Sequence, residues 1–356
     1  MTETKEIVVV DDLHDNVNEI ATLAHRAGCR YPIRAFSFEE FSHFVELADQ
    51  SASVEKKPET EELLSDHLQS KYSSTALLAV DHELSRAGRL LTDSAIVEVA
   101  SGLAIPVARY HRESTPGSES LFFRAFASPM AAVKVPFDGQ IGEQLCELAD
   151  GFQQLHYRVA NLDLNELKHQ PARVLAEALG APGLSLMFEE YLTARSFFRP
   201  EALSSSDKVR TLATRVGYWL YNVILRYPGL ILNEISAASY VGIDPSDFRK
   251  EEVSNIFSDA EYRGPFASHT RYWWRFQLDD ILEGEEGVDV VKKRTGKSVR
   301  ECVCSITDRA PAGFYDLASG KPVSREESVG ELQWIPKGAD LARVNTETYE
   351  EVAPLR

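Results

Sequence analysis

Cysteine is scarce in this chain, with four residues among 356. They are Cys29, Cys146, Cys302 and Cys304, and only the last two are close in the sequence. This usage favours free thiols in a reducing cytoplasm over a disulfide scaffold. A zinc site at Cys302 and Cys304 would need two more ligands, and no second Cys or His pair follows nearby.

Long apolar runs and positive charge are also lacking. No apolar stretch approaches the roughly 20 residues of a bilayer-spanning helix, and the first residues are too polar for a signal peptide. We therefore expect a cytoplasmic protein without membrane insertion. The chain has 38 Lys and Arg against 55 Asp and Glu, for a formal net charge of -17. Because phosphate backbones attract cationic surfaces, nucleic acid is an unfavourable general partner.

Strand and helix patterns alternate over residues 1–156, which predicts an α/β domain. Five β-α units with right-handed crossovers form a parallel sheet. The expected strands are 7–10, 31–38, 76–80, 105–111 and 131–135. The expected helices are 14–28, 39–48, 93–104, 119–127 and 138–159. Residues 51–74 are polar and charged, and we expect them to form a surface insertion outside the core.

The rest of the chain divides into two further regions. Residues 157–295 carry apolar positions at helical spacing, including 266–282, and predict a mainly α-helical region. From 296 to 356 the helical pattern stops, and short strands with Gly and Pro turns are expected at 301–306, 313–324 and 331–344. A chain of this length exceeds one compact core, so we expect separate domains.

Carboxylates follow two of the predicted strands. Asp11 and Asp12 come directly after 7–10, and Asp81 directly after 76–80. In a parallel sheet these strand ends meet at one edge, where ligands bind. Converging carboxylates need a hard cation, and Mg²⁺ suits them. Asp81 could then act as a nucleophile toward a phosphoryl group, with Lys134 balancing charge.

The segments that carry these residues resemble the receiver domain of two-component response regulators. The resemblance covers about residues 5–156 and rests on "VVVDD", "LLAVDHEL" and "AAVKVPF", with Lys134 following Asp81 by 53 residues. It implies a flavodoxin-like, doubly wound five-stranded parallel sheet. Asp81 would be the phosphoacceptor, Lys134 a phosphoryl contact, and the Mg²⁺ ligands Asp11, Asp12, Asp81 and the backbone carbonyl of Glu83.

The same resemblance implies partners. A histidine kinase or phosphotransfer protein would donate the phosphoryl group in a two-component system or phosphorelay. The receiver would then control an output region that binds a protein partner, and a homodimer is compatible with this scheme. We expect no enzymatic activity beyond phosphoryl acceptance, because the C-terminal half shows no nucleophile with a base and an orienting residue.

Several positions depart from the receiver pattern. His111 stands where a Thr or Ser normally contacts the phosphoryl group, and Arg112 replaces a small residue beside it. Val135 separates Lys134 from Pro136, and the aromatic switch position is Ala131. His111 and Arg112 could donate to a phosphoryl group or block it. The alternative is therefore a degenerate, non-phosphorylated receiver that acts as a scaffold.

A second alternative is a transcription regulator with a helix-turn-helix near residues 230–256. Ala238, Gly242 and Phe248 have the spacing of a small residue, a turn glycine and an apolar residue in the next helix. The would-be recognition helix carries four acidic residues against Arg249 and Lys250, whereas a DNA reader should be net positive.

Overall fold

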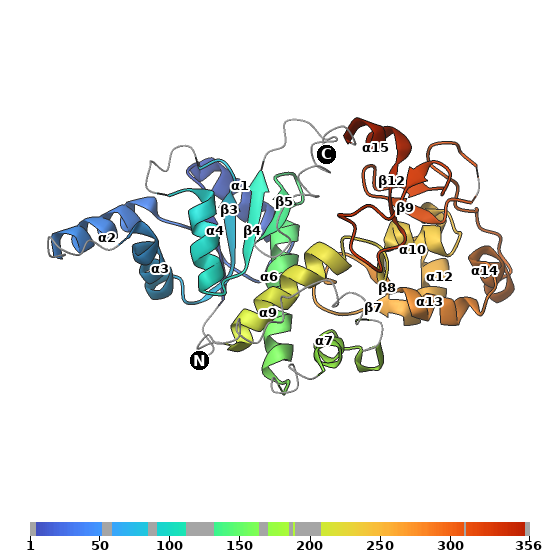
Figure 1. Ribbon diagram of the computed structural model, residues 1–356, viewed down its shortest axis with the longest axis horizontal. Helices are drawn as coiled ribbons and strands as arrows, with labels where there is room; N and C mark the ends of the chain where they lie inside the picture. Colours follow the sequence, from blue (N-terminus) through green and yellow to red (C-terminus); the bar gives the residue numbers. More distant parts are fainter. Residues whose placement is uncertain are drawn as a thin grey trace. The chain divides into compact units, whose positions relative to one another are not determined.

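The computed structural model describes residues 5–51, 59–84, 91–111, 132–163, 170–184, 188, 208–309 and 311–352. These residues form two compact units (Figure 1). The N-terminal unit comprises the segments Met1–Ser114, Ser128–Asp163 and Arg199–Tyr218. The C-terminal unit comprises the segments Thr115–Ala127, Leu164–Phe198 and Trp219–Arg356. The N-terminal unit thus extends beyond residue 156.

The N-terminal unit contains a five-stranded, all-parallel sheet with strand order β2-β1-β3-β4-β5. Its elements are β1 Glu6–Val10, α1 His14–Arg26, β2 Ile33–Ala35, α2 Phe38–Ser51, α3 Thr60–Lys71, β3 Thr75–Asp81, α4 Asp93–Gly102, β4 Val107–His111, β5 Val133–Pro136, α6 Ile141–Ala160 and α9 Lys208–Trp219. The predicted α/β architecture with five parallel strands is confirmed. The predicted helix at 119–127 lies outside the described residues.

Local sequence explains where the first strand and helix stop. The apolar run Ile7–Val10 is fully buried, as expected for a strand covered on both faces. Helix α1 buries Val17, Ile20 and Ala24, which recur at helical spacing. The chain leaves the helix at Gly28, whose φ of +73° is a conformation that glycine adopts without a steric penalty.

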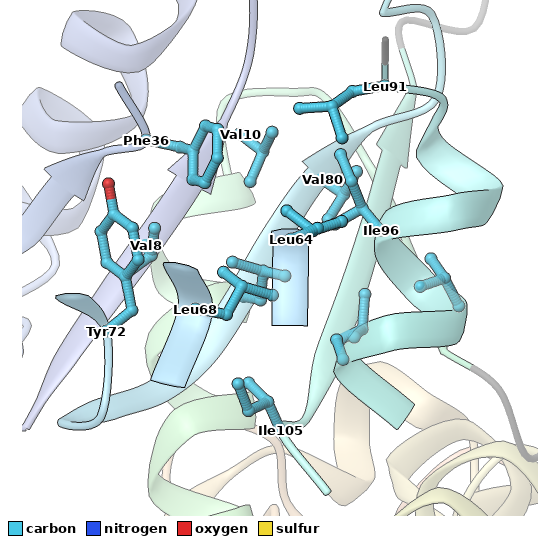
Figure 2. Packing of buried hydrophobic residues seen from close by; sticks show 14 of the residues in the cluster. Val8, Val10, Phe36, Leu64, Leu68, Tyr72, Val80, Leu91, Ile96 and Ile105 are labelled. Carbon is cyan, nitrogen blue, oxygen red and sulfur yellow. The ribbon is translucent and has the colours of Figure 1, made fainter. Parts of the chain in front are cut away.

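Residues 51–74 were expected outside the core, and this prediction was wrong for residues 59–74, whereas residues 52–58 lie outside the described part of the chain. Residues Thr60–Lys71 form α3, which buries Leu64 and Leu68 at 1% exposure each. Figure 2 shows these leucines packed with side chains of β1, β3 and α4. The leucines recur at helical spacing among many charged residues, so the polar composition concealed an amphipathic helix.

The scarcity of cysteine was also misleading, because Cys29 and Cys146 form a disulfide with a Cα–Cα distance of 5.6 Å. The two residues are 117 positions apart, and the packing of α1 against α6 brings them together. Cys302 and Cys304 are free and buried. The expectation of four free thiols is therefore corrected for the first pair.

The C-terminal unit combines short helices with two small sheets. Its elements are α7 Pro171–Ala178, η3 Pro182–Leu184, the π-helix η6 Leu220–Ile224, β6 Ile231–Asn233, α10 Glu234–Tyr240, α11 Pro245–Phe248, α12 Glu251–Ser254, η7 Asn255–Ala260, β7 Glu261–Tyr262, β8 Tyr272–Trp274, α13 Arg275–Leu282, α14 Gly287–Thr295, β9 Phe314–Asp316, β10 Pro322–Val323, β11 Ser328–Val329, β12 Ala342–Asn345 and α15 Thr346–Val352. The sheets have strand orders β6-β8-β7 and β10-β9-β12-β11. The second sheet confirms a β-rich C-terminal region.

Two predictions for this unit were wrong in detail. Residues 266–282 were expected to be helical, but Tyr272–Trp274 form the central strand β8, and the helix begins only at Arg275. All three aromatic residues of β8 are buried, and large aromatic side chains favour strands. Residues 301–306 contain an isolated bridge from Glu301 to Ile243 instead of a regular strand. Throughout the described part of the chain, no helix has the length and apolar character needed to span a membrane.

Candidate functional site

Three carboxylates meet at the carboxyl ends of β1 and β3. Ligand atoms of Asp11, Asp12 and Asp81 all lie within 4.8 Å of one another. The two strands are hydrogen-bonded neighbours in parallel register, with Val10 opposite Val80, so their next residues emerge side by side. The predicted acidic cluster is therefore formed, and it could hold a metal ion.

Asp11 is the most buried member of the acidic cluster, at 6% exposure. Its Oδ1 accepts a hydrogen bond from the backbone N–H of Leu13 at 2.7 Å. Its Oδ2 accepts one from Asn16 Nδ2 at 3.0 Å and one from the Tyr110 hydroxyl at 2.7 Å. These donors compensate the buried charge and fix the carboxylate in place.

Tyr110 is a site residue that the sequence analysis missed. Burial and the negative charge of Asp11 raise the pKa of its hydroxyl, so the group stays protonated and can donate. Tyr110 lies opposite Asp81 in the ladder between β3 and β4 and therefore shares its face of the sheet. Strand alternation could have placed it there, but its bond to Asp11 spans 99 positions and has no local signature.

Asp81 is half-buried and ends strand β3. Burial raises the pKa of its carboxyl above the ordinary value, and the charges of Asp11 and Asp12 raise it further. The backbone N–H of Glu83 donates to Asp81 Oδ1 at 3.2 Å, and this hydrogen bond lowers the pKa. A divalent cation would relieve the repulsion among these carboxylates, so the donor set fits a hard metal ion.

A second polar cluster lies on the α4 side of the same edge. Arg109 Nη2 pairs with Asp93 Oδ2, and His82 Nδ1 lies 3.0 Å from the same carboxylate oxygen. The His82 and His111 rings meet edge to face, with centroids 5.8 Å apart. Burial lowers the pKa of His82, and the positive charges of Arg109 and Lys134 lower it further. His111 thus ends β4 beside His82.

Lys134 lies on β5 and is exposed. The register sets Lys134 opposite Arg109 and sets Pro136 opposite His111 at the strand ends. Lys134 therefore stands two residues before the end of its strand, on the face that it shares with Arg109. Arg112 and Ala131 lie outside the described residues.

The residues of the predicted helix-turn-helix form two helices and a turn. Ala238 lies in α10, Gly242 forms the turn with a φ of +76°, and Phe248 ends α11. Ala238 and Phe248 are both fully buried. Within residues 245–254, all described, the second helix stops after four residues, and an extended Lys250 precedes α12.

The two basic residues of this segment are held by acidic neighbours. Arg249 pairs with Glu234, and Lys250 Nζ lies 2.7 Å from Asp247 Oδ1. Asp247 also accepts from the backbone N–H of Arg300 at 2.9 Å. The paired cations and the interrupted helix do not resemble a DNA-reading helix, which is continuous and presents cations to the phosphates.

Comparisons of the chain with protein-family models, with curated proteins and with solved structures found no match. Functional assignment therefore depends on the geometry of the acidic cluster and on the sheet that carries it.

Proposed function

We propose that this chain is a response-regulator-like signalling protein in which Asp81 accepts a phosphoryl group with the help of Mg²⁺. The observation that carries the proposal is the meeting of Asp11, Asp12 and Asp81 within 4.8 Å at the carboxyl edge of a parallel sheet. The strand order β2-β1-β3-β4-β5 is compatible with a flavodoxin-like receiver. Mg²⁺ fits because it binds one or two carboxylates and keeps several waters.

In the proposed reaction, a carboxylate oxygen of Asp81 attacks phosphorus and the bond from phosphorus to the donor breaks. The leaving group takes the electron pair, and Asp81 becomes an acyl phosphate. Asp11, Asp12, Asp81 and the carbonyl of Glu83 would hold the cation, which would offset charge on the phosphoryl oxygens. Three hydrogen bonds orient the Asp11 carboxylate for this role.

Donors and outputs follow from the same proposal. A histidine kinase or a phosphotransfer protein supplies the phosphoryl group, and the C-terminal unit binds a protein partner in response. A homodimer is a further arrangement to test. The transcription-regulator alternative is the less favoured one, because Arg249 and Lys250 are held by acids and the helix over 245–254 is interrupted.

One observation favours the other alternative, a degenerate receiver that acts as a scaffold. Lys134 lies opposite Arg109, whereas His111 faces Pro136 at the strand ends. The lysine is therefore set back from the edge where a phosphoryl group on Asp81 would lie. Arg112 decides between the alternatives, because a guanidinium can cap a phosphoryl group or occupy its place.

The test is phosphate transfer from acetyl phosphate or phosphoramidate with Mg²⁺, followed by intact mass. Wild type should gain one phosphoryl group, and Asp81→Asn should gain none. Asp15→Asn is a matched control, since Asp15 is exposed in the first turn of α1. If Arg112 caps the group, Arg112→Ala should be modified but lose phosphate faster. If Arg112→Ala is phosphorylated and wild type is not, Arg112 blocks the site and wild type is a degenerate receiver.

A further inference from the structure

The disulfide between Cys29 and Cys146 lies at a closely packed junction of α1 and α6. Cys146 follows Gly142 by four residues, and both share one face of α6. A Cβ atom at Gly142 would lie 2.2 Å from the backbone nitrogen of Ala24 in α1, so the helix backbones touch there. This close approach brings the two cysteines within bonding reach, with a Cα–Cα distance of 5.6 Å.

The two cysteines at this junction differ in solvent exposure. Cys146 is only 2% exposed, whereas Cys29 is half-buried. Arg30, whose side chain is 66% exposed, pairs with Asp150 at 2.5 Å, four residues beyond Cys146 on the same face. A small oxidant or reductant therefore meets Cys29 before Cys146.

Helix α1 connects this junction to the acidic cluster. The helix starts at His14, two residues after Asp12, and Asn16 in its first turn donates to Asp11 Oδ2 at 3.0 Å. Its 13 residues form one continuous helix that ends just before the disulfide. Fixing its C-terminal end against α6 restricts the motion of the whole helix, and with it the position of Asn16.

We propose that Cys29 and Cys146 are a reversible redox couple that sets the cation affinity of the acidic cluster. The Cys29 thiolate attacks hydrogen peroxide and becomes a sulfenic acid, and the Cys146 thiolate then attacks its sulfur to form the disulfide. Overall two thiols and one peroxide give one disulfide and two waters. The oxidised form holds Asp11 in its binding geometry, and the reduced form binds the cation more weakly. The inference rests on the cation site of the proposed function.

The experiment uses the full chain, oxidised with peroxide or reduced with dithiothreitol. Maleimide labelling in denaturant, read by mass, should find two free thiols after oxidation and four after reduction. Titration calorimetry with Mg²⁺ alone should give a dissociation constant roughly fivefold higher for the reduced form. Cys29→Ser should match the reduced form under both treatments.

A second variant separates disulfide formation from its effect on Mg²⁺ affinity. Asn16→Ala should form the disulfide normally but bind Mg²⁺ equally in both states, because its link to Asp11 is gone. Four free thiols after oxidation of folded wild type, or equal Mg²⁺ affinity in its two forms, would overturn the inference. If the oxidised and reduced forms bind Mg²⁺ with the same measurable affinity, the proposed function stands and only the redox inference fails. If neither form binds Mg²⁺ and Asp81 is not phosphorylated, both the redox inference and the proposed function fail.

Discussion

The Tyr110 hydroxyl donates a hydrogen bond to Asp11 Oδ2 at 2.7 Å and so links the end of β4 to the end of β1 across β3. Both residues are buried, at 1% and 6% exposure. The bond supplies a donor to a charge that would otherwise be poorly solvated. It therefore orders the acidic cluster and stabilises the fold.

Replacing Tyr110 with Phe should lower the free energy of unfolding. The ring would keep its packing, but the buried carboxylate would lose one of its three donors, at a cost of about 1.5–3 kcal/mol. Urea denaturation measures the change. Tyr157→Phe is the control, because Tyr157 is 73% exposed and should change little. Equal stability of Tyr110→Phe and wild type would mean that water replaces the hydroxyl.

Mg²⁺ should stabilise the folded protein through preferential binding at the acidic cluster. At a free concentration 100-fold above the dissociation constant, the gain would be about 2.7 kcal/mol. Asp12→Ala should lose most of this gain, whereas Asp15→Ala should retain it. Thermal unfolding with and without millimolar Mg²⁺ provides the measurement. An unchanged gain in Asp12→Ala would place the cation elsewhere.

His67 should make the N-terminal unit sensitive to acid. It is 4% exposed among the rings of Phe36, Phe41, Phe44 and Tyr72, and no described residue makes a hydrogen bond to its Nε2. Burial lowers its pKa below the ordinary 6.5, and the charge of Lys71 lowers it further while that of Glu40 opposes this. The unfolded chain then binds more protons than the native one, so stability falls as the pH drops below about 6.5.

The pH dependence has a direct measurement. The loss of unfolding free energy between pH 7 and pH 5 should be smaller in His67→Phe than in wild type. His43→Phe is the control, because the His43 side chain is 70% exposed on α2. Parallel pH profiles for wild type and His67→Phe would show that His67 does not titrate in this range.

Leu68→Ala should be strongly destabilising, because α3 is part of the core. Leu68 is 1% exposed, and truncating a buried leucine costs about 2–5 kcal/mol. Leu47→Ala on α2 is a suitable control, since Leu47 is 51% exposed. Chemical denaturation compares the two. A small and equal effect of both substitutions would restore the original expectation of a surface insertion.

Sequence reasoning succeeded where a signal was local and strong. The uninterrupted run Ile7–Val10 followed by two acids predicted both a buried strand and the edge at which the acids meet. It failed at α3, where Leu64 and Leu68 lie among charged residues. The polar composition of the segment predicted a surface insertion, although the spacing of the leucines fits an amphipathic helix. Tyr272–Trp274 gave a similar ambiguity, since a short apolar run fits a helix face as well as a strand.

Other features could not be predicted from local patterns at all. The pairing of Cys29 with Cys146 depends on how α1 packs against α6, 117 positions apart. The bond from Tyr110 to Asp11 depends on the order of three strands. The offset of Lys134 from His111 depends on the register of β4 and β5, which is fixed by pairing rather than by residue type.

The most direct test of the account locates the phosphoryl group. Protein treated with acetyl phosphate and Mg²⁺ should be reduced with borohydride, which converts an acyl phosphate to an alcohol, and then mapped by peptide mass spectrometry. The account predicts a converted residue at Asp81, dependent on Mg²⁺ and absent without the phosphodonor. Conversion confined to another carboxylate, or an unconverted Asp81 in wild type with every donor tried, would contradict the account.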